Sequence, residues 1–251
     1  MNPLNKVVIF GATSAIAQHV ARKLVARGAS VFCVGRNEKK LEVVVQDLKV
    51  RAGNSENVHG CTADLTDESR HLALIEQAAT VLGHIDAVLV AHGSLPDQAQ
   101  CQKDLKALRS EFDTNACSVI SLLTVSANYL EPRGKGVLAV IGSVAGDRGR
   151  QSNYVYGAAK AAVATFAEGL QHRLSVKGVD VVTIKPGFVD TPMTDGMDKS
   201  GLLWAQPDRV ADGIIRAMER GQRVSYLPWF WWGIMAIIRN IPEPIFRRMR
   251  I

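Results

Sequence analysis

The sequence has little of what disulfide-bonded, zinc-bound or exported proteins need. Only four of its 251 residues are cysteine, and Cys33, Cys61, Cys101 and Cys117 show no Cys-x-x-Cys spacing. We therefore expect neither a disulfide framework nor a metal site, and a reducing cytoplasm suits the chain. The N-terminal apolar run covers only residues 7–10, which is shorter than the apolar region of an export signal. A cytoplasmic protein is expected.

Acidic residues are in the minority. Asp and Glu number 24 against 30 Lys and Arg, which gives a formal charge of +6 and a pI near 9.3. This balance suits an anionic partner such as a nucleotide cofactor, a phosphorylated substrate, a lipid headgroup or nucleic acid. The basic residues are scattered, and no helix-turn-helix, zinc-finger or aromatic-basic single-strand pattern is present, so nucleic-acid binding is not expected.

What the chain does have is an alternation of short apolar runs with longer helical patterns. Strands are predicted at residues 6–10, 30–35, 58–62, 87–91, 136–141 and 179–184, with helices at 14–27 and 38–50. Continuous apolar strands of this kind form parallel sheets that are covered on both faces. The sequence therefore predicts one doubly wound α/β domain of Rossmann type over residues 1–226, followed by a hydrophobic and basic extension at 227–251.

Aromatic residues make up only 6% of the chain, yet three of its four tryptophans lie in the uncharged run at residues 226–238. Arg239, Arg247, Arg248 and Arg250 follow. The run is too short for a bilayer span, which needs about 20 residues. Tryptophans and arginines favour the interface of an anionic membrane, so peripheral contact with the inner face of the plasma membrane is expected. Alternatively, the aromatic residues pack on the core or between subunits.

The first strand is followed by a turn that suits a nucleotide. Gly11 begins the segment Gly-Ala-Thr-Ser-Ala-Ile-Ala, which opens the next helix. Free amides at a helix N-terminus bind phosphate, and Thr13 and Ser14 could cap the helix or contact phosphate oxygens. Ala15 and Ala17 stand where further glycines usually allow close backbone approach. The turn alone is equally compatible with a structural role.

Two later strand ends suit an adenosine group. Arg36 follows the second strand, where a carboxylate would bind ribose hydroxyls and an arginine pairs with a 2′-phosphate. We therefore expect NADPH to be preferred, with NADH as the alternative. Asp64 could place a carboxylate near the adenine amino group or cap the following helix, although Thr66 or Asp67 is better placed for that cap.

The strongest pattern joins Ser143 to Tyr156 and Lys160. A tyrosine and a lysine four residues apart share one face of a helix. An ammonium beside the phenol favours phenolate and so lowers a pKa near ~10, which makes proton transfer feasible at neutral pH. Ser143 ends a strand and can hold a substrate oxygen in line with the phenol. Tyr154 does not fit, because residue 158 is alanine.

With Asp-Thr-Asn-Ala at residues 113–116 and Pro-Gly-Phe-Val-Asp-Thr at 186–191, the chain resembles the short-chain dehydrogenase/reductases over nearly its whole length. The resemblance implies a catalytic tetrad in which Tyr156 exchanges a proton with the substrate oxygen and Ser143 orients that oxygen. Lys160 would lower the tyrosine pKa and bind the nicotinamide ribose, and Asn115 would support a proton-relay water. NAD(P) would supply the hydride. Besides Tyr156 and Lys160, the implied cofactor-binding residues are Gly11, Thr13, Ser14, Ala15, Ile16, Arg36, Asp64, Leu65, Ala91, His92, Gly93, Pro186, Gly187, Val189 and Thr191.

The sequence departs from that family at two places. Alanine at position 15 could crowd the pyrophosphate, and the family's Asn-Asn-Ala-Gly segment is here Ala91-His92-Gly93. His92 could act as a base, but the tetrad already supplies one. We expect a packing or cofactor-facing role for this histidine.

Residues 152–157, Leu-Pro-Trp at 227–229 and the segment 239–248 look like the decaprenylphosphoryl-2-keto-ribose reductases. That narrower resemblance implies reduction of a polyprenylphosphoryl 2-keto-pentofuranose to the arabinofuranose, as one half of a 2-epimerase whose flavin oxidase partner makes the ketone. Arg148 and Arg150 would pair with the phosphodiester, and a lid at residues 193–206, with Met197, Leu202, Leu203 and Trp204, would cover the first prenyl units.

Two alternatives remain open at the level of sequence. One is a soluble reductase of another ketone or sugar whose C-terminal segment serves a homo-oligomer. The other is a catalytically idle nucleotide sensor that stabilises a flavin enzyme, although a sensor has no need of the proton donor that Tyr156 provides.

Overall fold

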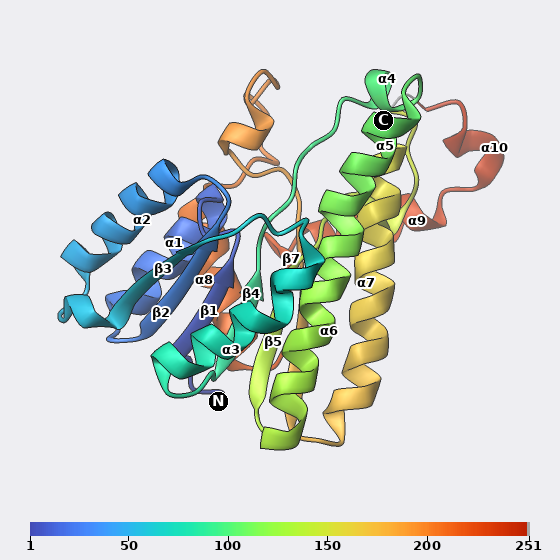
Figure 1. Cartoon of the computed structure of the whole chain (residues 1–251). Coiled ribbons are helices and arrows are strands. Elements are labelled where there is room, and N and C mark those ends of the chain that lie inside the picture. Colours follow the sequence, from blue (N-terminus) through green and yellow to red (C-terminus); the bar gives the residue numbers. More distant parts are fainter. Residues whose placement is uncertain (250–251) are drawn as a thin grey trace.

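The β-branched runs of the sequence form one parallel sheet of seven strands, in the order β3-β2-β1-β4-β5-β6-β7 (Figure 1). The computed structural model describes residues 1–249. Helices cover both faces of the sheet, so the predicted doubly wound α/β fold is confirmed. The strands are β1 Lys6–Phe10, β2 Ser30–Gly35, β3 Val58–Thr62, β4 Ala87–Val90, β5 Gly136–Ile141, β6 Val179–Pro186 and β7 Val224–Leu227.

Alternate residues of the central strands enter two separate cores. Val7 and Ile9 of β1 pack with helices α1, α2 and α8, whereas Val8 and Phe10 pack with α3, α6 and α7 on the other face. Both faces of β1 are therefore buried from solvent, which explains its unbroken apolar sequence. The helices are α1 Ala15–Val25, α2 Glu38–Arg51, α3 His71–Leu82, α4 Gln98–Cys101, α5 Leu105–Phe112, α6 Ser118–Leu130, α7 Tyr154–Ser175 and α8 Pro207–Glu219.

The predicted element boundaries differ from the structure at a few ends. Helix α1 is shorter than predicted, with Ser14 as its N-cap, and β4 ends at Val90. Strand β6 runs two residues further than predicted because it pairs with β7, where Lys185 faces Tyr226 and Pro186 faces Leu227. The sequence analysis did not separate β7 from the uncharged run that overlaps it.

The C-terminal segment combines buried and exposed side chains. After β7, a cis peptide bond joins Leu227 to Pro228, and the chain continues in α9 Trp231–Asn240 and α10 Glu243–Phe246. Trp231 and Met235 are buried against Val144, whereas Trp229 and Trp232 are 80% and 63% exposed. The segment therefore packs on the core with one side and presents aromatic side chains to solvent with the other. Across residues 1–249, no helix is both long and apolar enough to cross a membrane.

Candidate functional site

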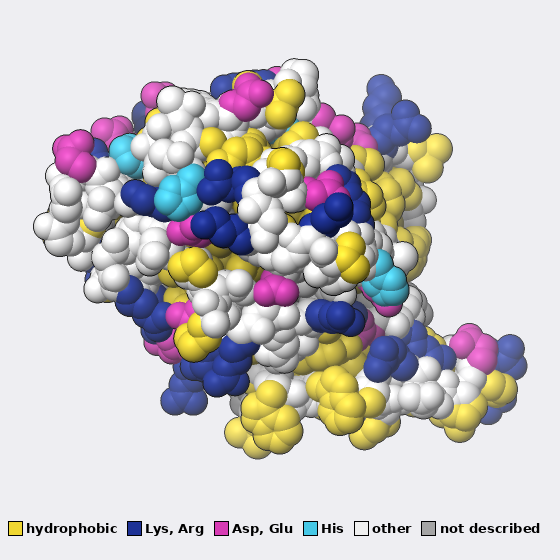
Figure 2. All heavy atoms as spheres, turned by 90° about the horizontal axis from the view of Figure 1, so that it is seen from below, with side chains coloured by type: hydrophobic (Ala, Val, Ile, Leu, Met, Phe, Trp, Pro, Cys, Tyr) yellow, Lys and Arg dark blue, Asp and Glu magenta, His cyan; other side chains and the backbone are white. Residues whose placement is uncertain are grey.

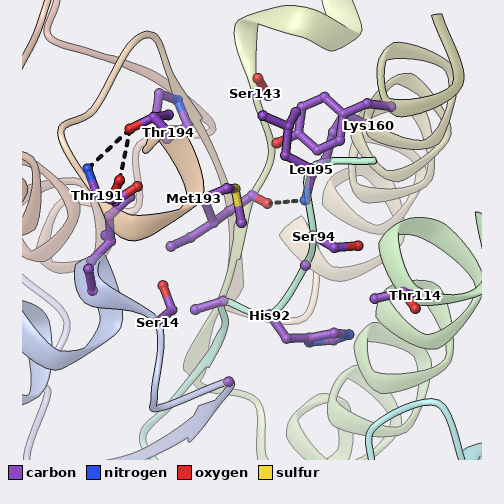
Figure 3. A pocket seen from close by; sticks show the side chains of 18 of the residues that line it. Ser14, His92, Ser94, Leu95, Thr114, Ser143, Lys160, Thr191, Met193 and Thr194 are labelled. Carbon is purple, nitrogen blue, oxygen red and sulfur yellow. Dashed lines mark hydrogen bonds between the residues drawn. The ribbon is translucent and has the colours of Figure 1, made fainter. Parts of the chain in front are cut away.

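A cavity of about 690 Å³ opens over the carboxyl ends of the strands, where the loops after β1 to β6 converge. Figure 3 looks into it, with Ser143 and Lys160 on one side and Ser14 and Thr191 on the other. Every residue that the sequence predicted for cofactor binding lines this cavity. The carboxyl edge of an open parallel sheet, at the point where strand order reverses, is the usual ligand site of such folds.

The strand order reverses between β1 and β4, and their following turns touch there. Gly11 has φ +79°, and a Cβ on it would lie 2.5 Å from the backbone nitrogen of His92. Only glycine combines that conformation with such a close approach. Gly11 thus brings the first turn against the loop after β4 and forms the floor of the crevice.

The N-terminus of α1 fits a phosphate group. Ser14 occupies the N-cap without a side-chain capping bond, and Ala15 and Ile16 line the cavity beside it. Ala17 is fully buried in the core, so its methyl group faces away from the cavity. Of the two alanines, only Ala15 adds bulk on the ligand side. Free amides, the helix dipole and an uncommitted hydroxyl together suit a pyrophosphate.

The far end of the cavity is basic. Arg36 lies there with Lys40 of α2, a residue that the sequence analysis missed although it stands four positions later. Asp64 accepts hydrogen bonds from the Thr66 amide and hydroxyl at 3.0 and 2.9 Å, and these bonds hold the pKa of its carboxyl below the ordinary value. Asp64 therefore closes a local turn and does not cap α3, which begins later, at His71.

Ser143, Tyr156 and Lys160 come together at the opposite end. Ser143 follows β5, and a hydrogen bond joins its hydroxyl to that of Tyr156 near the start of α7. A Cβ on Gly157 would lie 2.9 Å from the carbonyl oxygen of Ala145, so α7 rests directly on the turn after Ser143. The glycine beside Tyr156 is what permits this packing. Tyr154, as expected, lies outside the cavity and is 42% exposed.

Burial controls the protonation of this pair. It raises the pKa of Tyr156 to about 12, against a smaller lowering by the Ser143 hydrogen bond. Burial also lowers the pKa of Lys160 to about 8. The Lys160 ammonium lies 5.7 Å from the centre of the Tyr156 ring and donates to the carbonyl of Ile141 at 3.1 Å. The expected net lowering of the tyrosine pKa is therefore not found, because loss of solvation disfavours the phenolate and sets the direction of the shift.

Asn115 is almost fully buried in a π-helical turn, Asp113–Cys117, between α5 and α6. Its side-chain oxygen accepts from the amide of Ser94 at 3.0 Å, which ties the turn to the loop after β4. Such one-turn π-helical segments often mark functional sites. Asn115 does not itself line the cavity, but its side chain contacts Gly93 and Ser94, which do.

His92 is neutral. Burial and the nearby Lys160 lower its pKa to about 3. The Ser118 hydroxyl donates to the carbonyl of Thr114 at 3.0 Å, so it accepts from Nε2 of His92 at 2.9 Å. A histidine with this pKa does not take up a proton near neutral pH. The packing role expected for it agrees with these contacts.

The three residues suggested for substrate binding separate in the structure. Arg150 lines the cavity, and its Nε is buried without a hydrogen-bond partner. Arg148 points away: it donates to the carbonyls at the end of α9, among them Ile241 at 2.8 Å, and its guanidinium lies 3.6 Å from the centre of the Phe246 ring. Trp204 lies outside the cavity and stacks on Phe188, which does line it. Neither Arg148 nor Trp204 is therefore placed to contact a substrate in the cavity directly.

Comparison with known proteins identifies the family. Residues 5–200 match the short chain dehydrogenase family. The chain is 37% identical over 243 residues to an uncharacterized oxidoreductase of Mycobacterium tuberculosis (strain ATCC 25618 / H37Rv), which covers 97% of this chain and 96% of that protein. An uncharacterized oxidoreductase of Staphylococcus epidermidis (strain ATCC 35984 / DSM 28319 / BCRC 17069 / CCUG 31568 / BM 3577 / RP62A) is 31% identical over 218 residues, 87% of this chain and 92% of that one. The chain belongs to the short-chain dehydrogenase family.

Solved structures agree on the fold. Levodione reductase superposes with a TM-score of 0.81 at 19% identity, over 90% of this chain and 97% of that one. A short-chain type dehydrogenase/reductase from Mycobacterium ulcerans gives 0.79 at 22% identity, over 97% of each chain. Because the family uses NAD(P)(H) and the relatives are named oxidoreductases, this short-chain dehydrogenase is an NAD(P)-dependent oxidoreductase.

Proposed function

We propose that this short-chain dehydrogenase is an NADPH-dependent reductase of an anionic, lipid-linked keto sugar, a polyprenylphosphoryl 2-keto-pentofuranose that it converts to the arabinofuranose. Arg150 is the observation that carries the anionic part of this proposal. It stands between Ser143 and Tyr156 in sequence and lines the same cavity, with its Nε buried and unpartnered. A buried guanidinium donor without a partner is costly, and a phosphodiester oxygen would satisfy it.

The preference for NADPH is supported by the basic end of the cavity. Arg36 and Lys40 both line it, and no carboxylate stands at residues 35–37. Arginine and lysine side chains suit the additional phosphate on the adenosine ribose of NADPH. Arg36 follows β2 and Ser143 follows β5, on opposite sides of the point between β1 and β4 where the strand order reverses, which agrees with a cofactor that extends across the crevice.

The chemistry would be a balanced reduction. NADPH, when bound, supplies the hydride that reaches the carbonyl carbon. Tyr156 gives its phenolic proton to the carbonyl oxygen, which Ser143 orients through its hydroxyl. Since burial keeps the Tyr156 pKa near 12, the phenol carries that proton at neutral pH. The Lys160 ammonium would then stabilise the phenolate that remains.

The lipid part of the proposal is supported by two apolar surfaces, one in the cavity and one at an outer edge of the molecule. Phe188, Met193 and Met197 line the cavity and are each more than a third exposed. They would cover the first prenyl units in place of Leu202, Leu203 and Trp204. Figure 2 shows hydrophobic side chains projecting from one edge of the molecule beside Lys and Arg. A ketone of this kind must come from oxidation of the corresponding sugar, so a flavin oxidase partner belongs to the same proposal.

One assay tests the function. NADPH oxidation is followed with a farnesylphosphoryl 2-keto-pentofuranose and with the same keto-pentose lacking phosphate and lipid. We expect a clear preference for the lipid-linked ketone, and Arg150→Met should reduce kcat/KM for it by about ten- to a hundredfold with little change for the neutral sugar. Arg109→Met on the exposed side of α5 is the matched control. Equal reduction of both ketones would favour the alternative, a general ketone reductase.

A further inference from the structure

Two carboxylates, Asp64 and Glu111, line the cavity. Only Asp64 has an expected role, beside the adenosine group of the cofactor. The other, Glu111, is the last but one residue of α5 and belongs to the catalytic end of the cavity. Its neighbour Ser94 follows Gly93 directly, and a Cβ on Gly93 would lie 2.9 Å from Asn115 Oδ1 and 3.5 Å from Lys160 Nζ. Glu111 contacts Asn115 and Ser94, and Ser94 is one residue from the glycine that approaches Lys160. Neither the family pattern nor the sequence analysis gives Glu111 a role.

Hydrogen bonds hold one oxygen of this carboxylate. The Ser94 hydroxyl donates to Glu111 Oε2 in a short contact, and Asn115 Nδ2 lies 3.2 Å from the same oxygen. Asn115 Nδ2 also donates to Ser94 Oγ at 3.0 Å and to the Glu111 carbonyl at 2.9 Å. The orientation of the amide is unambiguous, because Asn115 Oδ1 accepts from the Ser94 amide, which can only donate.

The other oxygen is available. Both side-chain bonds to the carboxylate end on Oε2, and among residues 1–249 no hydrogen bond or ion pair engages Oε1. Glu111 nevertheless lines the cavity and is half-buried. The result is an acceptor whose direction is fixed in advance by two neighbours. Such preorganised groups bind a donor without the cost of ordering themselves.

We propose that Glu111 Oε1 accepts a hydrogen bond from a substrate hydroxyl beside the reacting carbonyl, which makes the substrate class an α-hydroxy ketone. This inference rests on the proposed function only in that the protein reduces a ketone. A carboxylate accepts from a neutral hydroxyl more strongly than a neutral acceptor does. A site built for a hydroxyl also rejects the analogue that lacks it, because its own polar group would be buried unpaired.

The test compares two ketones that differ only at that position, 2-hydroxycyclohexanone and 2-methylcyclohexanone. The wild-type protein with NADPH should favour the hydroxy ketone in kcat/KM by about ten- to a hundredfold. Glu111→Gln keeps an oxygen for Ser94 and Asn115 but removes the charge, so the preference should fall several-fold. Ser94→Ala leaves the carboxylate but loosens it, and should also reduce the preference. Glu42→Gln, on the exposed side of α2, is the matched control and should leave it unchanged.

Binding without turnover gives a second measurement. With NADP⁺ present, cis-1,2-cyclohexanediol should bind more tightly than cyclohexanol by titration calorimetry, and Glu111→Gln should remove most of that difference. If Glu111→Gln slowed both ketones by one factor and left their ratio intact, the carboxylate would serve only to position Asn115 and the proposal would fail. Equal use of the two ketones by the wild-type protein, or no reduction of the hydroxy ketone, would also overturn it. A failure of the lipid-linked ketone alone would count against the proposed function and leave this inference standing.

Discussion

Tyr156 and Lys160 are both shifted by burial, and the shifts have different consequences for pH. Tyr156, with a pKa of about 12, keeps its proton throughout the neutral range. Lys160 has a pKa lowered to about 8, so it loses its charge as the pH rises through that value. We expect kcat for reduction to be level below pH 8 and to decline above it, because the charge that stabilises the tyrosinate is lost. The measurement is kcat at saturating NADPH and ketone from pH 6 to 10, and a profile that stayed level to pH 10 would contradict it.

Tyr156→Phe tests the proton donor itself. Removing the hydroxyl removes the proposed proton donor, and general acid catalysis contributes roughly 10²–10⁴-fold. We expect a loss of that size in kcat with a near-normal Kd for NADPH, since the ring that contacts Lys160 remains. Tyr154→Phe is the control, because this exposed tyrosine bonds only Gln102 in the described chain. A larger loss from Tyr154→Phe would mean that the catalytic tyrosine had been misassigned.

The choice between NADPH and NADH also depends on single residues. We expect the wild-type protein to have the higher kcat/KM with NADPH than with NADH. Arg36→Ala should reduce this preference by about ten- to a hundredfold, the size of one charge-assisted contact. Lys40→Ala should lower it further, whereas Lys39→Ala, whose side chain does not line the cavity, should have little effect. A wild-type protein that used the two cofactors equally would refute the assignment.

The sequence was most informative where a residue's position depends on a strand end. Gly11, Arg36, Asp64 and Ser143 each follow a strand, and parallel strands bring their carboxyl ends to one edge. Arg148 and Arg150 lie in an irregular loop, where no period indicates which of two nearby arginines faces inward. Glu111 was missed for a related reason: its role depends on contacts with Ser94, which is distant in sequence.

At the scale of elements, the turn after Ser143 and the C-terminal helices hold each other. Arg148 donates to backbone carbonyls at the end of α9 and pairs with Glu243 of α10 at 3.2 Å. Asp147, one residue earlier, is buried between Lys185 of β6 and Tyr226 of β7, whose hydroxyl donates to it at 2.7 Å. The C-terminal segment is therefore fixed to the loop that carries Ser143 and Arg150.

Arg148→Ala should release this attachment. The bonds from its guanidinium to carbonyls and a carboxylate are worth about 1.5–3 kcal/mol of unfolding free energy, and their loss leaves the end of α9 unsupported. We expect faster amide hydrogen exchange in residues 238–246 and a higher KM for the anionic ketone, because Arg150 shares the loosened loop. Arg148→Lys should restore part of both effects. Unchanged exchange in 238–246 would show that the contacts do not hold the segment.

Strands were easier to predict than the C-terminal elements. Strands β1, β2, β4 and β5 are nearly continuous apolar runs between helices, and their pattern is local. Strand β7 has only four residues, one of its sides is partly exposed, and an uncharged run continues beyond it. Its existence depends on pairing with β6, which no local pattern reveals. The same applies to α9, where burial of Trp231 follows from its contact with Gly187.

At the scale of the whole molecule, the C-terminal segment faces two environments. Trp231 packs on Gly187 at the edge of the cavity, and Met235 is fully buried. Deletion of residues 227–251 would thus remove core side chains and the last residue of β7, and activity would fall on any substrate. A membrane role must be tested by exposed residues only. The large apolar side chains exposed there are Trp229, Trp232, Ile237, Ile245 and Met249. Arg239, Arg247 and Arg248 are exposed around them, and Arg250 lies outside the described residues.

The membrane prediction is therefore argued from Trp229 and Trp232. Their indoles, 80% and 63% exposed, would enter the interface of a bilayer, while the nearby arginines meet anionic headgroups. Burying most of one indole is worth on the order of 2 kcal/mol, so Trp229→Ser with Trp232→Ser should weaken binding to phosphatidylglycerol-containing vesicles by about a hundredfold or more. Melting temperature and kcat/KM for a short, water-soluble ketone should stay near wild type, because neither side chain belongs to the core. Leu72→Ser with Val43→Ser, which changes exposed apolar side chains of α3 and α2, is the matched control. Vesicle binding that survived the tryptophan changes, or that was equally weak with and without phosphatidylglycerol in the wild-type protein, would leave the exposed edge as a contact for another protein surface.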